Sequence, residues 1–280
     1  MKLENLNPFA DIKKIPLYGA NNGANVQSSA WSVHLNDNMN LDKPWQEVGI
    51  VGKDYMLVSN KEIVDMVGEV IDASDLELAT DKMFWNGKQF MQCYKAVEEI
   101  DAEVKVGDNL GIGVMVGNSY DGSTSGRFSI FAYRLLCLNG MMSKTHFSQY
   151  RFKHTKSNDN WAEELEKAAE ILSHAGENVK QFATTCSKLV KPFSVTTLGE
   201  LREEYIPKLP VTTFGKVVDR LYELPEVKDP GHTITTWDFL NAATNVLWHK
   251  NKQTVADYSN NDYVTTGILS YANQNLIPVA

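Results

Sequence analysis

Alternating hydrophobic and polar positions dominate the first half of the chain. Apolar runs at residues 45–51 and 55–58 flank Gly52-Lys53-Asp54, a pattern that predicts a hairpin with a short loop. Asn86-Gly87 separates two further apolar runs and predicts a second hairpin, because both residues tolerate a positive φ. This half of the chain therefore favours antiparallel strands.

The alternation continues on both sides of a polar loop at residues 118–123. Strands are expected at 110–116 and 128–138, and a third alternating segment runs from 145 to 155. A helix is expected to begin after Ser59, because Ser59 and Glu62 have the spacing of a capping box and an apolar face follows them. The result is an antiparallel meander with at least one helix.

The period changes beyond residue 158. Apolar residues recur there at alternating four- and three-residue steps as far as Leu189, which predicts one long amphipathic helix with a kink or break near Gly176. Shorter helices follow. The fold class is therefore α+β, with an irregular arm at 1–44 that contains one short strand, an antiparallel α+β core at 45–157, and a helical region at 158–280 packed on that core. The last two segments could also form one continuous domain.

The chain has no recognisable catalytic, metal or cofactor motif. Glycines 111, 113 and 117 lie inside a strand, whereas a dinucleotide-binding loop needs them between a strand and a helix. The three cysteines are widely spaced and include no C-x-x-C pair, so we expect reduced thiols in a cytoplasmic protein. We expect no signal peptide, no membrane span and no resident cofactor or metal.

Charge is distributed unevenly along this acidic chain of 280 residues. The formal net charge is −8, yet residues 122–158 contain six Lys or Arg and no Asp or Glu. This interval therefore carries +6, and the remainder carries −14. Aromatic residues are interleaved with the cations, so the interval offers groups for phosphates and flat rings for bases.

These residues give the candidate nucleic-acid contacts. Phosphate contacts are predicted for Lys144, Arg151, Lys153 and Lys156, with Arg134 as a more buried candidate, and base stacking is predicted for Phe147 and Tyr150. Two simpler interpretations remain open. The aromatic residues could be the buried face of a sheet, and the cations could pair with glutamates of the following helix, at 163–170.

Several short segments of the chain form a recognisable series. They are Asn118-Ser119-Tyr120-Asp121-Gly122-Ser123, residues 133–141, Arg151-Phe152-Lys153-His154-Thr155, and residues 236–244 with His249. In this order they resemble a known family of phage/plasmid-like proteins that carries a domain of unknown function. Residues 55–60 are similar to the family's N-terminal strand-to-helix junction. Tyr120 departs from the pattern, because the family often has His there. The resemblance implies a protein encoded by a virus or mobile element and acting in a bacterial cytoplasm.

The leading hypothesis is a non-catalytic, single-stranded nucleic-acid-binding protein, such as a strand-annealing or recombination factor, that acts as a homo-oligomer. The first alternative is an interaction protein that inhibits or redirects a host enzyme through its acidic surface or long helix. The second is an enzyme with an unrecognised site around Asp121 and Asn139. The sequence does not choose between DNA and RNA.

Overall fold

The computed structural model describes residues 3–21, 24–37, 42, 44–97, 100–136, 139–143, 147, 149–152, 154, 161–249 and 255–275. The chain divides into two compact units, and each unit is discontinuous in sequence. Unit 1 comprises residues 1–94, 114–129 and 149–173, and unit 2 comprises residues 95–113, 130–148 and 174–280. The units therefore interleave along the chain, whereas the segments predicted from the sequence are consecutive.

A three-stranded antiparallel sheet begins unit 1, after a short 3-10 turn η1 (Leu3–Asn5). Its strands, in spatial order, are β1 (Ile12–Asn21), β2 (Ala24–Asn36) and β3 (Trp45–Gly52). The prediction of an irregular arm at 1–44 was therefore wrong. A register shift between Pro16 and Tyr18 accommodates the proline within β1, and the inward side chains of Val33 and Leu35 are fully buried.

The predicted hairpin between residues 45–51 and 55–58 was also wrong. Strand β3 pairs with β2 instead, and Val51 lies opposite Trp31. Residues 55–58 lie outside the named strands, and their carbonyl groups accept hydrogen bonds from side chains, including one of 2.6 Å from Lys14 Nζ to Tyr55 O. An apolar run cannot show which neighbour it pairs with, and here the nearest neighbour in sequence was not the partner.

The larger sheet has seven strands. They are β4 (Leu78–Trp85), β5 (Gln89–Ala96), β6 (Glu103–Lys105), β7 (Asp108–Ser119), β8 (Gly126–Arg134), β9 (Asn139–Met141) and β10 (Gln149–Phe152). The main path runs β10-β8-β7-β5-β4, with β6 beside β7 and β9 beside β8. The predicted Asn86-Gly87 hairpin is confirmed, since Gly87 has φ of 89° and Asn86 Oδ1 accepts the Gln89 N–H at 2.7 Å.

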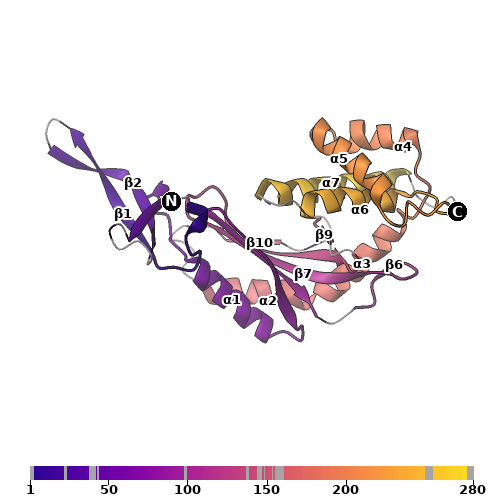
Figure 1. Cartoon of the computed structure of the whole chain (residues 1–280). Helices are drawn as coiled ribbons and strands as arrows, with labels where there is room; N and C mark the ends of the chain where they lie inside the picture. Colours follow the sequence, from indigo (N-terminus) through magenta and orange to yellow (C-terminus); the bar gives the residue numbers. More distant parts are fainter. Residues whose placement is uncertain are drawn as a thin grey trace. The chain divides into compact units, whose positions relative to one another are not determined.

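Two helices complete unit 1. The predicted capping box begins α1 (Asn60–Asp72), where Ser59 Oγ accepts the Glu62 N–H and the Glu62 carboxylate accepts the Ser59 N–H. Helix α2 (Trp161–Ser173) packs beside α1 and β10 (Figure 1). The predicted long helix ends here. His174, with φ of −95° and ψ of 1°, separates α2 from α3 (Ala175–Ser187), so the break falls two residues before Gly176.

Unit 2 is mostly helical. After α3 come α4 (Val195–Glu200), a π-helical turn η3 (Leu201–Tyr205), α5 (Val211–Glu223), α6 (Thr236–Trp248) and α7 (Val255–Asn275). Helix α6 contacts α5, α7 and β9 (Figure 1). Its side chains are buried around most of its circumference. The protein is thus α+β, as predicted, with antiparallel sheets followed by a helical second half.

The glycines of β7 confirm the structural interpretation of that segment. A Cβ atom placed on Gly113 would lie 2.5 Å from the ring of Phe131, and one on Gly111 would lie 2.8 Å from Leu135 Cδ2. These glycines make room for neighbouring side chains within a sheet, and no helix follows β7 to receive a phosphate.

Candidate nucleic-acid interface

Two arginines face each other across the last two strands of the larger sheet. The register of β8 and β10 places Arg151 directly opposite Arg127, with Gln149 opposite Ser129. Directly opposed residues of antiparallel strands project from the same face, and their Cβ atoms are about 5 Å apart. All four residues belong to unit 1. We call these two side chains the arginine pair.

Hydrogen bonds along the strands hold Arg151 in place. Its Nε donates to Gln149 Oε1 at 3.1 Å, and Gln149 Nε2 donates to Ser129 Oγ at 2.9 Å. The Arg151 side chain is exposed, whereas Ser129 is buried. The bond at Nε leaves the two terminal nitrogens of the Arg151 guanidinium, with their N–H donors, for a ligand.

Arg127 is more enclosed. Its Cγ would lie 3.1 Å from a Cβ on Gly117, so the methylene stem crosses β7 where that strand lacks a side chain. Burial lowers the pKa of Arg127, and the charge of Arg151 lowers it further. Neither member of the arginine pair has a carboxylate partner within the described part of the chain. Among the described residues these two like charges thus lie side by side without a counter-ion, which is unfavourable until an anion binds.

The opposite face of β10 carries the aromatic residues. Phe152 is buried and packs on Gly126, which lies directly opposite it, and Tyr150 is half-buried with Lys167 Nζ 5.5 Å from its ring centre. The Lys167 ammonium is itself paired with Glu163 of the same helix at 2.8 Å. Arg151 and Tyr150 therefore point to opposite faces, so one ligand reaches both only by passing around the β10 edge.

The other candidate residues have different locations. Arg134 is buried and bonded to two carboxylates, Asp108 at 2.8 Å and Glu226 at 3.0 Å. Phe147 is buried against Phe182, with ring centres 4.7 Å apart. Both lie in unit 2, and we do not retain them as contacts to a ligand. Lys144, Lys153 and Lys156 lie outside the described residues.

Sequence reasoning missed Arg127 as a site residue, although it counted its charge. Alternation alone places Arg127 on one face of β8, but the partner on that face depends on the register with β10, 24 residues further along the chain. The feature that could have identified Arg127 is that the two paired strands, β8 and β10, both lack acidic residues.

The polar loop at 118–123 is anchored by a buried network in unit 1. Asn118 Nδ2 donates to Val58 O at 3.0 Å and to Asn60 Oδ1 at 2.9 Å, and the Asn60 N–H donates to Tyr120 Oη at 2.9 Å. Burial raises the pKa of the Tyr120 phenol, which stays neutral. Asp121 Oδ1 accepts the Ser123 N–H at 3.0 Å, so the carboxylate helps to form the turn.

His154 lies against the same region. Its ring stacks on Tyr55 with centres 4.8 Å apart, and its Nδ1 bonds to Met56 O at 3.2 Å. Burial lowers the pKa of His154, which favours the neutral imidazole. Because Nδ1 carries the proton in this bond, Nε2 is an acceptor, and this buried atom has no hydrogen-bond partner among the residues that the structure describes.

A second buried network anchors β9 to the helices of unit 2. Asn139 Nδ2 donates to Asn241 O at 3.1 Å, and Asn139 Oδ1 accepts hydrogen bonds from Asn245 Nδ2 at 3.1 Å and His249 Nε2 at 2.9 Å. Asn261 of α7 bonds to Gly140 O and to the Met142 N–H, both at 2.9 Å. The amide of Asn139 is thus used to hold strand and helix together.

Unit 2 also contains a buried carboxylate that orients a histidine. Asp238 Oδ2 accepts hydrogen bonds from the Thr235 N–H and from His232 Nε2, both at 2.8 Å, and Lys105 Nζ lies 3.9 Å from Oδ1. Thr235 and Asp238 form the capping box of α6. A histidine that donates Nε2–H to a carboxylate presents Nδ1 as a proton acceptor. Sequence reasoning missed this pair, although the T-x-x-D spacing before an apolar run was visible.

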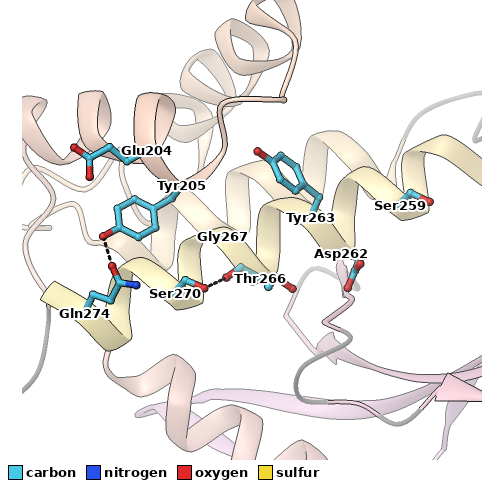
Figure 2. A pocket seen from close by; sticks show the side chains of 9 residues that line it. All are labelled: Glu204, Tyr205, Ser259, Asp262, Tyr263, Thr266, Gly267, Ser270 and Gln274. Atoms are coloured by element: carbon cyan, nitrogen blue, oxygen red, sulfur yellow. Dashed lines mark hydrogen bonds between the residues drawn. The ribbon is translucent and has the colours of Figure 1, made fainter.

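The π-helical turn η3 and one face of α7 border a hollow of about 650 Å³ in unit 2 (Figure 2). Tyr205 Oη donates to Gln274 Oε1 across it at 2.8 Å, and Glu204 and Asp262 contribute carboxylates. Its lining residues are Glu204, Tyr205, Ser259, Asp262, Tyr263, Thr266, Gly267, Ser270 and Gln274. These residues include no Lys or Arg, so this hollow is chemically unsuited to a polyanion.

The described residues limit two further kinds of site. Nowhere among them do three His, Cys, Asp or Glu side chains gather in the manner of metal ligands. Every helix in the described ranges is too short or too polar to cross a bilayer. Cys93 and Cys186 are buried, and neither forms a disulfide within the described structure.

Comparison with protein families identifies a match to most of the chain. Residues 47–266 match the model of a family described as a domain of unknown function, DUF932. The chain shows no significant similarity to a curated protein or to a solved structure. The matched region covers most of the chain, including both members of the arginine pair and both buried networks. The chain therefore belongs to the DUF932 family.

Proposed function

We propose that this protein binds single-stranded nucleic acid without catalysis, as a strand-annealing or recombination factor of phage or plasmid origin. The observation that supports the proposal is the arginine pair, in which Arg127 and Arg151 lie side by side without a carboxylate partner in the described structure. A phosphate between them neutralises their repulsion and accepts charge-assisted hydrogen bonds from both.

The placement of Tyr150 favours a single strand over a duplex. Tyr150 lies on the opposite face of β10, which is the last strand of the sheet path. A flexible single strand can place a phosphate at the arginine pair and turn around this edge to stack a base on Tyr150, whereas a stiff duplex cannot. Stacking of one base on an aromatic ring contributes about 1–3 kcal/mol.

Oligomerisation is part of the proposal because of the charge distribution. Outside residues 122–158 the chain carries a formal charge of −14, which opposes the approach of a polyanion to a monomer. Several arginine pairs on one strand raise the overall affinity, since each further contact becomes intramolecular. Light scattering after size-exclusion chromatography, with and without a long oligonucleotide, tests this point: a monomer in both samples contradicts it.

Fluorescence polarisation with a labelled single-stranded oligonucleotide tests the proposed binding. We expect binding at low ionic strength, and we expect Arg127→Gln with Arg151→Gln to weaken it at least tenfold. Lys61→Gln is the matched control, because Lys61 is an exposed unit 1 cation already paired with Asp65 at 2.6 Å. No binding by the unmodified protein, or equal losses in the control and the double variant, contradicts the proposal. A Tyr150→Leu variant tests the stacking contact separately.

A further inference from the structure

The charge of the arginine pair suits one particular form of phosphate. Two guanidinium groups carry a charge of +2, and an internal phosphodiester carries −1, so it leaves one charge unbalanced. A phosphate monoester carries about −1.5 to −2 at pH 7 because its second ionisation has a pKa near 6. The monoester therefore comes closer to neutralising the pair.

Hydrogen-bond geometry leads to the same ligand. The directly opposed positions of Arg127 and Arg151 put two arginine side chains on the same face of the sheet, and each guanidinium can bind two oxygens at once. A monoester offers three unesterified oxygens and a diester offers two. Since Gln149 holds Arg151 by its Nε, the remaining donors of Arg151 are oriented before a ligand arrives.

The partial burial of Arg127 adds a steric reason. Its stem lies over Gly117, where an added Cβ would meet both Arg127 Cγ and the buried Met91, and the residue as a whole is half-buried. The end of a strand carries its phosphate on one ester bond and can approach such a site directly. An internal phosphate must bring nucleotides on both sides with it.

We infer that the arginine pair recognises the terminal phosphate of a nucleic-acid strand, a phosphate monoester dianion. The inference rests on the proposed function and makes it more specific, because it makes the end of a strand the preferred contact.

Three oligonucleotides of one sequence test this: one with a 5′-phosphate, one with a 3′-phosphate and one with hydroxyls at both ends, each with an internal fluorescent label. We expect at least one phosphorylated strand to bind about tenfold more tightly than the unphosphorylated strand. Arg127→Gln should abolish this preference, and Lys61→Gln should preserve it. Arg151→Lys should reduce it, since lysine keeps the charge but loses the paired donors.

Circular dichroism and thermal unfolding show whether each variant is folded. If Arg127→Gln is not folded, Arg151→Lys still tests the inference. Equal affinities for all three strands overturn the inference. If those equal affinities still fall in the arginine variants, the proposed function survives; if no strand binds, both fail. Competition by thymidine 5′-monophosphate or inorganic phosphate distinguishes the source of the monoester. Either competitor binding as tightly as the phosphorylated strand overturns the assignment to a strand end.

Discussion

Removal of one member of the arginine pair should stabilise the protein when no ligand is bound. In Arg151→Gln the repulsion with Arg127 disappears. Taking the two charges as about 7 Å apart in a medium of water's dielectric constant, the repulsion is about 0.6 kcal/mol, within the range of about 0.2–1 kcal/mol for cross-strand pairs. The larger repulsion energy that the low dielectric constant of a protein interior would give does not apply, because Arg151 is exposed. The lost bond to Gln149 is also exposed and offsets part of the gain.

Urea unfolding at about 10 mM and 1 M salt measures this effect. The Debye length falls from about 30 Å to about 3 Å between these conditions, so the gain should be present at low salt and absent at high salt. Lys61→Gln should change stability in the opposite direction, since loss of its exposed pair with Asp65 should destabilise the protein slightly at low salt and not at high salt.

Two results refute the reasoning. A loss of stability in Arg151→Gln at low salt shows that the arginine has a stabilising partner. A gain that persists unchanged in 1 M salt shows that repulsion between charges is not its cause.

Three further predictions follow from buried groups. Arg134→Met should lower the free energy of unfolding by about 3–5 kcal/mol because it leaves Asp108 as a buried charge without its main partner, and urea unfolding measures the loss; a loss below 1 kcal/mol contradicts an internal role. The pKa of His154 is lowered in the folded state, so the unfolded chain binds the proton first and stability should fall as the pH drops below about 6.5. Unfolding at pH 7.5 and 5.5 should show a smaller pH effect in His154→Gln, and an unchanged effect contradicts this assignment. Gly126→Ala should destabilise by about 1–3 kcal/mol, since the new methyl group would overlap the ring of Phe152; thermal unfolding unchanged from wild type contradicts that packing.

Local patterns predicted local structure well. Ser59 and Glu62 form both bonds of the capping box, and Asn86-Gly87 forms the tight hairpin. In each case the interacting groups are within three residues, so the sequence window contains the whole cause. The same holds for Asp121, whose carboxylate bonds to the N–H two residues on.

Partners distant in sequence could not be predicted. The predicted strand at 55–58 was wrong because β3 pairs with β2 instead. The segment predicted as an irregular arm contains β1 and β2 despite its Asn, Gly and Pro content. Arg134 looked like a candidate ligand contact, yet its carboxylates come from Asp108 and Glu226, 26 and 92 positions away. The charge of a segment can be counted from sequence, but pairing of each cation depends on tertiary contacts.

The central claim is that the arginine pair contacts a phosphate of a single strand. The salt dependence of binding tests it most directly, because each phosphate contact on a single strand contributes about −0.7 to the slope of log K against log salt concentration. Since both arginines contact one phosphate, the account predicts that Arg127→Gln with Arg151→Gln makes the slope less steep by about 0.7, while Lys61→Gln leaves it unchanged. A slope in the double variant equal to that of the unmodified protein would contradict the account.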